Sequence, residues 1–441
     1  MLSLLGRRRR NRDRQLAMPP SPAPAGREGR SRDDDDKEMT NLPDDQVFEV
    51  LTRVPLDDLA ACRAVSTRWR AITYEPAFAP LHCRRAGAFS GYLVQTTTRY
   101  GCGHIADFVS AHHPSPAAPL SLDFVPRPGR PWSREDVRVV AVAPRLGLAC
   151  CVAAGTGRSP PRYYVCKPAT RQWRALPNPR LRFPTVATAM AALRSSDGEG
   201  AVEFRIVRLS SHVRGQYQYD SMRCEVFDSR RFAWRRAEDV PVPSVSLFGW
   251  GPAVHAHGAA HWLCCPYWDH RITHVVFALD VGTGAWWLIA LPREVEDVTA
   301  RYRWSHRQIT AVDGRLCLMV TMGGAGEVLE VWEMASYAEA RWEKKTRVSL
   351  KGLDELGEGG RVIPQHLDSS GVAFLDTGRR AIWYDLQRGE KIAQVQMNHK
   401  RAGEIFKFES DMTPCQTMGG RACQSSAATP MKKVDRGASI S

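Results

Sequence analysis

Long hydrophobic runs are missing from this chain of 441 residues. Its most apolar stretch, residues 139–154, is interrupted by Pro144 and Arg145. A membrane-spanning helix needs about 18 or more consecutive apolar residues, so no span is predicted. A secretory signal is also missing, because the first leucines precede the arginine run Arg7–Arg10, whereas a signal begins with its positive charge. We therefore expect no membrane contact and a location in the cytoplasm, the nucleus or both.

Motifs of catalysis are likewise scarce. The chain contains no GxSxG, HExxH or P-loop pattern. Its twelve cysteines are scattered without a CxxC pair. In a chain without a secretory signal we interpret them as reduced and mostly buried. We predict neither catalytic residues nor a cofactor.

One segment could still suggest a metal site, because it is rich in histidine and cysteine. Its members are His255, His257, His261, Cys264, Cys265 and His270. Metal ligands must converge on one point, whereas alternate residues of a strand face opposite ways. Because the segment alternates like a β-hairpin, we interpret its histidines as strand residues and predict no metal site.

Positive charge is in excess, with a formal net charge of +14. Residues 1–38, 39–82 and 409–441 together contribute about +2, which leaves about +12 on residues 83–408. A basic globular surface favours acidic partners, whether protein, phosphate or nucleic acid, but it identifies none of them.

Residues 42–72 have the pattern of three short helices. The first has apolar residues at the spacing of one helical face, namely Val47, Val50, Leu51 and Val54. Pro43 is expected to begin this helix and Pro55 to end it. Asp57 and Ser66 are expected to cap the second and third helices. A unit of about forty residues is too small for a self-sufficient core, so it usually lays its apolar residues on a partner.

The order and spacing of these residues resemble the F-box. The resemblance rests on Leu42-Pro43, Asp45, Val50-Leu51, Val54-Pro55, Leu59, Val65-Ser66 and Trp69-Arg70. It implies a helix set that binds a Skp-type adaptor and, through it, a cullin-based ubiquitin ligase. The residues that it assigns to the adaptor interface are Leu42, Pro43, Val50, Leu51, Val54, Pro55, Leu59, Val65 and Trp69. The alternative is an ordinary helical hairpin.

A repeat follows in the large remaining region. Each unit contains a strand, a polar turn and a tryptophan-bearing strand, as in residues 163–177, 224–241 and 275–292, with weaker copies at 328–345 and 381–395. The turn positions Lys167, Asp228, Asp280, Glu333 and Asp385 are 61, 52, 53 and 52 residues apart. The other half of each unit reads as a glycine-turn hairpin, as in residues 253–263, 309–320 and 366–377. A unit of about fifty residues built from two hairpins suits one four-stranded propeller blade.

Residues 86–408 have room for about six such blades, with the first one degenerate. This region resembles the F-box-associated, kelch-related propellers common in plant F-box proteins. It departs from kelch repeats, which carry a Gly-Gly pair in each blade, because such pairs occur here only at 323–324 and 359–360. The predicted fold is therefore a small all-α F-box of three short helices followed by an all-β, kelch-like propeller. A β-sandwich or a pseudo-repeat is the alternative.

Thirteen tryptophans are many for this length. Those that recur at one blade position are expected to fill the core between blades: Trp173, Trp234, Trp286 and Trp342. Others lie in loop-like sequence beside arginine, and exposed aromatic residues of this kind often anchor a partner. The candidate residues for binding a target are Trp268, Arg271, Trp304 and Arg307.

The predicted organisation is a tail at 1–38, the F-box at 39–82, the propeller at 86–408 and a second tail at 409–441, both tails being disordered. The resemblance implies a non-catalytic adaptor in which the propeller captures a target protein for ubiquitination. We expect that target to be a protein and not nucleic acid. The alternative is a propeller enzyme, or a basic propeller that binds nucleic acid or glycan, with a vestigial F-box.

Overall fold

The computed structural model describes residues 42–73, 75, 77–86, 89–97, 104–110, 118–119, 122–126, 137–153, 160–194, 202–211, 221–240, 251–264, 267–268, 271–272, 274–295, 306–322, 327–350, 353, 362–378, 380–396, 403–411, 415, 418 and 420–421. The chain divides into two compact units, Met1–Val47 and Phe48–Ser441, with the boundary inside the first described helix. The predicted tail at 1–38 lies outside the described residues.

Four short helices come first, and their bounds are α2 (Asp44–Leu51), α3 (Leu56–Val65), α4 (Thr67–Ile72) and α5 (Phe78–Ala86). The first three are the helices predicted from the sequence, whereas α5 was missed. Ser66 caps α4 as expected, because its Oγ accepts a hydrogen bond from the backbone N–H of Arg68 at 3.2 Å. The predicted cap at Asp57 was wrong, because α3 begins at Leu56 and so contains Asp57, and its N-cap residue Pro55 makes no side-chain hydrogen bond. Among the described residues no helix has the length and apolar character needed to cross a membrane.

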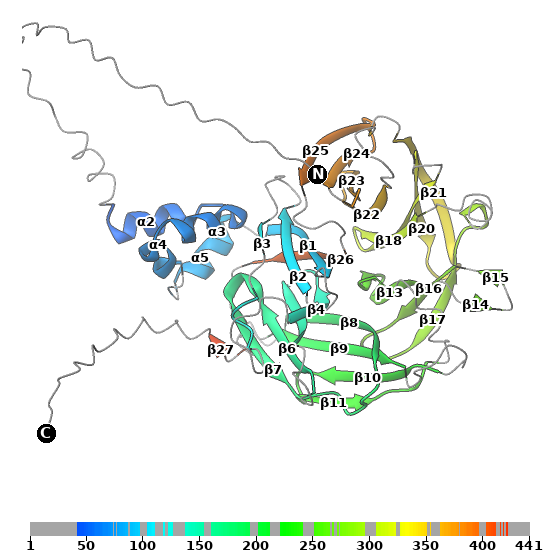
Figure 1. Ribbon diagram of the computed structural model, residues 1–441, viewed down its shortest axis with the longest axis horizontal. Helices are drawn as coiled ribbons and strands as arrows, with labels where there is room; N and C mark the ends of the chain where they lie inside the picture. Colours follow the sequence, from blue (N-terminus) through cyan, green and yellow to red (C-terminus); the bar gives the residue numbers. More distant parts are fainter. Residues whose placement is uncertain are drawn as a thin grey trace, which may run out of the picture. The chain divides into compact units, whose positions relative to one another are not determined.

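The β-strands of the described residues form six main antiparallel sheets, which we number as blades 1 to 6 (Figure 1). Blade 1 consists of β26 (Glu404–Ser410), β1 (Phe89–Thr97), β2 (His104–Ser110) and β3 (Ala118–Pro119). Blade 2 consists of β4 (Val137–Ala143), β5 (Leu148–Ala153), β6 (Arg162–Lys167), β7 (Gln172–Leu176) and β27 (Gly420–Arg421), with the short helix η1 (Pro168–Thr170) before β7. Blade 3 consists of β8 (Thr185–Arg194), β9 (Val202–Ser210), β10 (Arg223–Asp228) and β11 (Ala233–Arg236).

The remaining blades repeat the same order from the inner to the outer strand. Blade 4 consists of β12 (Val254–Ala256), β13 (Ala259–Cys264), β16 (Val275–Leu279) and β17 (Trp286–Ala290). Blade 5 consists of β18 (His306–Val312), β19 (Arg315–Met322), β20 (Val328–Ser336) and β21 (Arg341–Ser349). Blade 6 consists of β22 (Ile363–Leu367), β23 (Val372–Asp376), β24 (Arg380–Asp385) and β25 (Glu390–Gln396). A separate ribbon is made of β14 (Tyr267–Trp268) and β15 (Arg271–Ile272). The predicted six-bladed propeller is confirmed.

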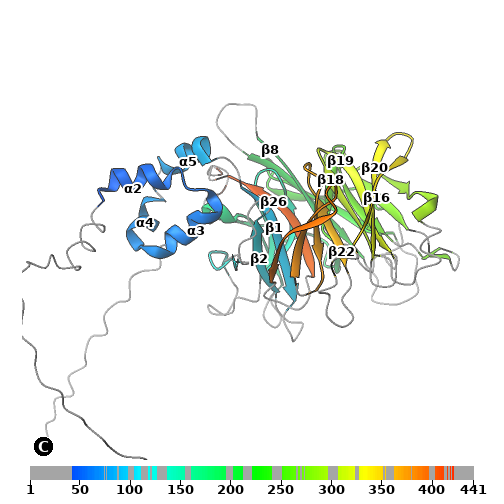
Figure 2. The same ribbon diagram turned by 90° about the horizontal axis from the view of Figure 1, so that it is seen from above.

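The ring is closed by pairing the two ends of the propeller sequence. Strand β26 pairs with β1 in antiparallel register from Phe89↔Ser410 to Gln95↔Glu404, so the last long strand becomes the inner strand of blade 1. The inner strands β18, β22 and β26 run from one face of the ring to the other (Figure 2). We call the face with the β4–β5, β12–β13 and β18–β19 turns the turn face, and the opposite one the loop face. Because β26 and β27 reach beyond residue 408, the expected boundary between propeller and C-terminal tail was placed too early.

A buried cluster fills each junction between neighbouring blades, and the recurring tryptophans lie in or against these clusters. The indole N–H of Trp234 in blade 3 donates to the carbonyl of Pro177, just after blade 2, at 2.7 Å. Trp342 in blade 5 likewise donates to Ala290 of blade 4 at 2.9 Å. Trp234 fills the core between blades as predicted, whereas Trp173, Trp286 and Trp342 are half-buried and pack against the clusters. Of the cysteines whose burial is described, all except Cys62 are buried, as expected.

Candidate functional site

The F-box helices hold one another through aromatic and polar contacts. Phe48 of α2 and Phe78 of α5 pack edge to face with ring centroids 5.6 Å apart. A ring nitrogen of His82 lies 2.9 Å from the carbonyl oxygen of Val54, just after α2. Burial lowers the pKa of His82, so its ring remains neutral and serves as a structural hydrogen-bond partner. Helix α5, which the sequence prediction missed, is therefore the support for α2.

The predicted adaptor-interface residues separate into two groups in the structure. Leu51 and Leu59 are 1% and 0% exposed, so they hold the chain's own helices together and are inaccessible to a partner. Large apolar side chains lie open on the same elements, with Val50 56% and Val65 72% exposed, and Leu42, just before α2, 45% exposed. Of the other predicted interface residues, Pro43 and Pro55 are exposed, and Val54 and Trp69 are half-buried.

The candidate target-binding residues are only partly described. Trp268 and Arg271 pair across the β14–β15 ribbon, which lies between β13 and β16 and therefore on the loop face. Trp304 lies outside the described residues. Arg307, at the start of β18, is half-buried and its Nη1 donates to Nε2 of His274 at 3.0 Å. Burial, together with the Arg307 charge, lowers the pKa of His274 to about 4, which suits its role as an acceptor.

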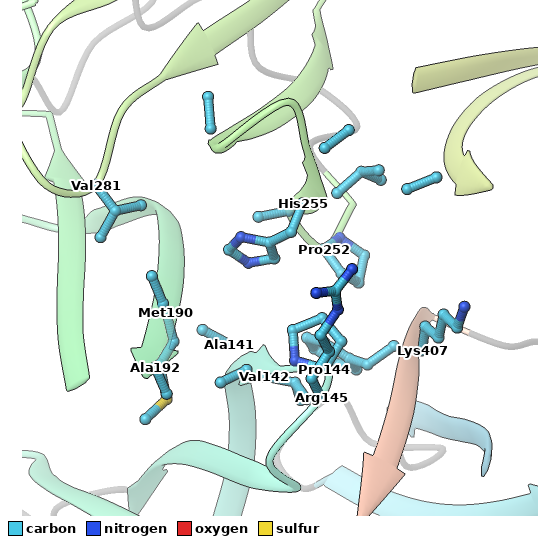
Figure 3. A pocket seen from close by; sticks show the side chains of 18 of the residues that line it. Ala141, Val142, Pro144, Arg145, Met190, Ala192, Pro252, His255, Val281 and Lys407 are labelled. Carbon is cyan, nitrogen blue, oxygen red and sulfur yellow. The ribbon is translucent and has the colours of Figure 1, made fainter. Parts of the chain in front are cut away.

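A cavity of about 1030 Å³ occupies the centre of the ring. It is lined by residues of all six blades, mainly from the inner strands and the turns that follow them. Figure 3 shows the side chains of Arg145 and His255, from blades 2 and 4, beside this space, with Met190 and Val281 on the other side and Lys407 of blade 1 extending away from them. The sequence analysis missed this site because each lining residue, taken alone, reads as an ordinary strand or turn residue.

Known protein families match both parts of this architecture. A family model described as F-box-like matches residues 39–79. A second, described as "F-box protein At3g26010-like, beta-propeller", matches residues 130–365, more than half of the chain. This chain belongs to the F-box protein At3g26010-like β-propeller family. The expected combination of an F-box and a propeller is thereby confirmed.

Curated relatives of this chain differ in how much of it they cover. F-box protein At5g49610 of Arabidopsis thaliana is 24% identical over 386 residues, which cover 85% of this chain and 97% of that protein. F-box protein At5g41720 of the same plant is 30% identical over 168 residues, which cover 38% of this chain and 84% of that protein.

The histidine-rich segment of the At3g26010-like propeller serves packing. The ring of His261 lies 3.2 Å from the Val254 carbonyl and 2.6 Å from the Tyr337 hydroxyl. His257, in the β12–β13 turn, accepts a hydrogen bond from the backbone N–H of Leu316 at 3.1 Å. Within the described part of the chain no three potential ligands gather where they could hold a metal ion. Cys265 and His270 fall outside the described residues.

Proposed function

We propose that this protein is a substrate-recognition adaptor of a Skp-cullin-F-box ubiquitin ligase. The observation that carries the proposal is the exposure of Val50 and Val65 on the same two helices in which Leu51 and Leu59 are buried. Exposed apolar side chains gain about 25 cal/mol for each Å² that a partner removes from water. The F-box-like match over residues 39–79 supports a Skp-type subunit as the proposed partner, with a cullin bound through it.

The propeller supplies the second half of the proposed function. A closed ring of six blades is a rigid platform that can hold a target protein close to a ubiquitin-charged enzyme. The rate enhancement then comes from proximity, so the chain needs no catalytic residues of its own. We place this activity in the cytoplasm or nucleus, and a fluorescent fusion found in the secretory pathway would contradict that placement.

The proposed target surface is the loop face around the β14–β15 ribbon, with Trp268, Arg271, Trp304 and Arg307 as its anchors. The contact between Arg307 and His274 supports this grouping, because it brings β18 beside the segment that follows the ribbon. Trp268→Ala and Trp304→Ala should weaken target capture and leave the melting temperature nearly unchanged. A sharp fall in melting temperature would show that these tryptophans belong to the core instead.

Adaptor binding is tested by recovering a Skp-type subunit with the full-length chain. The double variants Leu42→Ala with Pro43→Ala, and Val50→Ala with Val65→Ala, should each recover much less of it. Truncating each exposed valine removes about 1–2 kcal/mol of apolar contact with the partner. The matched control is Ile392→Ala, which truncates an exposed apolar residue of blade 6. Undiminished recovery with both double variants would refute the proposed interface.

A further inference from the structure

The central cavity has the size of a small-molecule site. Its volume of about 1030 Å³ is at the upper end of the roughly 300–1,000 Å³ typical of such sites. Part of its wall is apolar and only half-buried, including Leu146, Ala192 and Val254. An apolar wall of this kind favours a ligand with an apolar body.

Not every positively charged side chain of the cavity wall pairs with a carboxylate among the described residues. Three cations lie within ion-pair distance of a carboxylate, as the pairs Arg205–Asp228 (3.4 Å), Arg230–Glu203 (2.5 Å) and Lys407–Glu409 (3.2 Å). The fourth, Arg145, is exposed in the β4–β5 turn, and none of the described carboxylates pairs with it. Its guanidinium extends into the cavity in Figure 3. A guanidinium is the side chain best suited to bind a carboxylate through two parallel hydrogen bonds.

The other polar residues of the wall are less suited than Arg145 to bind a carboxylate. Burial lowers the pKa of His255 to about 4 and that of His366 to about 3, so both rings are neutral near pH 7. The Asp280 carboxylate is occupied by the N–H groups of its own turn, with Gly282 at 2.7 Å. Asp313 lies exposed in the β18–β19 turn at the turn face.

We propose that the central cavity binds a small organic molecule that carries one carboxylate on an apolar body. The carboxylate pairs with the Arg145 guanidinium at the turn face, and the body lies against the half-buried apolar residues of the wall, Leu146, Ala192 and Val254. Such a site is separate from the proposed adaptor surface on the helices and from the target surface on the loop face. It therefore does not depend on the proposed ligase function.

Calorimetric titration of the purified full-length chain tests the site. The probes are benzoate, octanoate and 4-phenylbutyrate, each compared with its neutral primary amide. At least one carboxylate should bind with a stoichiometry of one and about tenfold more tightly than its amide, the contribution expected of a charge-assisted hydrogen-bonded pair. Absence of binding by all three carboxylates would overturn the proposal.

Three variants locate the binding. Arg145→Gln should abolish the preference for the carboxylate over the amide. Arg231→Gln, which changes an exposed arginine of the β10–β11 turn outside the cavity wall, should preserve it. Ala192→Trp should block acid and amide alike by filling the cavity, with a melting curve to establish that the ring is still folded. An unchanged preference in Arg145→Gln would show that the carboxylate binds elsewhere.

Discussion

The charged pair of Arg208 and Glu225 is the most deeply buried ion pair described in the propeller. Its Nη1–Oε2 distance is 2.8 Å, and the two side chains are 4% and 1% exposed. The second carboxylate oxygen accepts hydrogen bonds from the backbone N–H groups of Arg180 and Leu181. The pair therefore fastens the segment between β7 and β8 onto blade 3.

Removing one member of this pair should be costly. Glu225→Ala leaves the Arg208 charge buried without its partner, and breaking a buried pair in this way costs about 3–5 kcal/mol of unfolding free energy. Glu343→Ala, which breaks an exposed pair with Arg341, should leave the unfolding free energy unchanged within error. Urea unfolding of both variants measures the difference. Equal losses would show that burial is not what makes Glu225 important.

Two buried histidines should make the propeller sensitive to acid. Burial lowers the pKa of His261 to about 4 and that of His366 to about 3 in the folded chain, whereas the unfolded value is about 6.5. The unfolded chain therefore takes up protons first, and stability present above about pH 6.5 is lost as the pH falls toward 4. Asp376 opposes this trend, because burial raises its pKa and favours its protonated form.

The expected loss between pH 7 and pH 5 is roughly 2 kcal/mol for each of the two histidines. Urea unfolding at both pH values measures it. His261→Gln can keep hydrogen bonds to Val254 and Tyr337 but cannot titrate, so it should unfold with a smaller pH dependence than the natural chain. An identical pH dependence in the two chains would assign the acid sensitivity to other groups.

At the scale of elements, the outer hairpins of the blades could be predicted from the sequence because their turns are formed by local hydrogen bonds. The Asp228, Asp280 and Asp385 carboxylates accept hydrogen bonds from backbone N–H groups two and three residues ahead. These hydrogen bonds join residues close together in the chain, so the turns can be recognised in the sequence. The repeat predicted from the sequence therefore corresponds to hairpins of the structure. Helix α5 was missed because its role, contact with α2, involves residues about thirty positions away.

One of these turns carries a strained residue. Ala340, between β20 and β21, has a φ of +51°, a left-handed conformation that costs a residue with a side chain about 1–2 kcal/mol. Ala340→Gly should therefore raise the unfolding free energy by about 0.5–1 kcal/mol, because glycine adopts this conformation without strain. Ala175→Gly, at an exposed and regularly paired position inside β7, should lower it by a similar amount. The melting temperatures of the two variants should shift in opposite directions. Shifts in the same direction would refute the claim that Ala340 is strained.

At the scale of the whole molecule, ring closure depends on β26. Phe406 and Phe408 of this strand belong to the cluster between blades 1 and 2, and Leu93 of β1 packs into the same cluster. A chain that ends before Gly403 should lose cooperative unfolding and protease resistance throughout the ring, because the loss opens blade 1 toward both neighbours. A chain that ends after Arg421 retains β26 and β27 and should behave like the full chain. A protease-resistant ring in the shorter chain would contradict this dependence.

The identity of the strand that closes the ring is also what the sequence could not reveal. Blade 1 joins two segments that are each incomplete on their own, and its inner strand comes from the region expected to end the propeller. The central cavity is hidden for the same reason, because its lining comes from six blades spread over the length of the propeller. Local patterns predict hairpins, whereas contacts between distant segments depend on the ring as a whole.

The distance along the chain between β1 and β26 has a consequence for protein synthesis. Gln95 and Glu404, which face each other in the closed blade, are 309 residues apart. At a translation rate of about 5–20 residues per second, β1 is synthesised roughly 15–60 s before β26. Throughout that interval β1 can pair with β2 on one edge, but its other edge lacks a partner. Its apolar residues Leu93 and Val94 are buried in the finished ring. We therefore expect ribosome-associated chaperones to remain bound to this protein until translation is nearly complete.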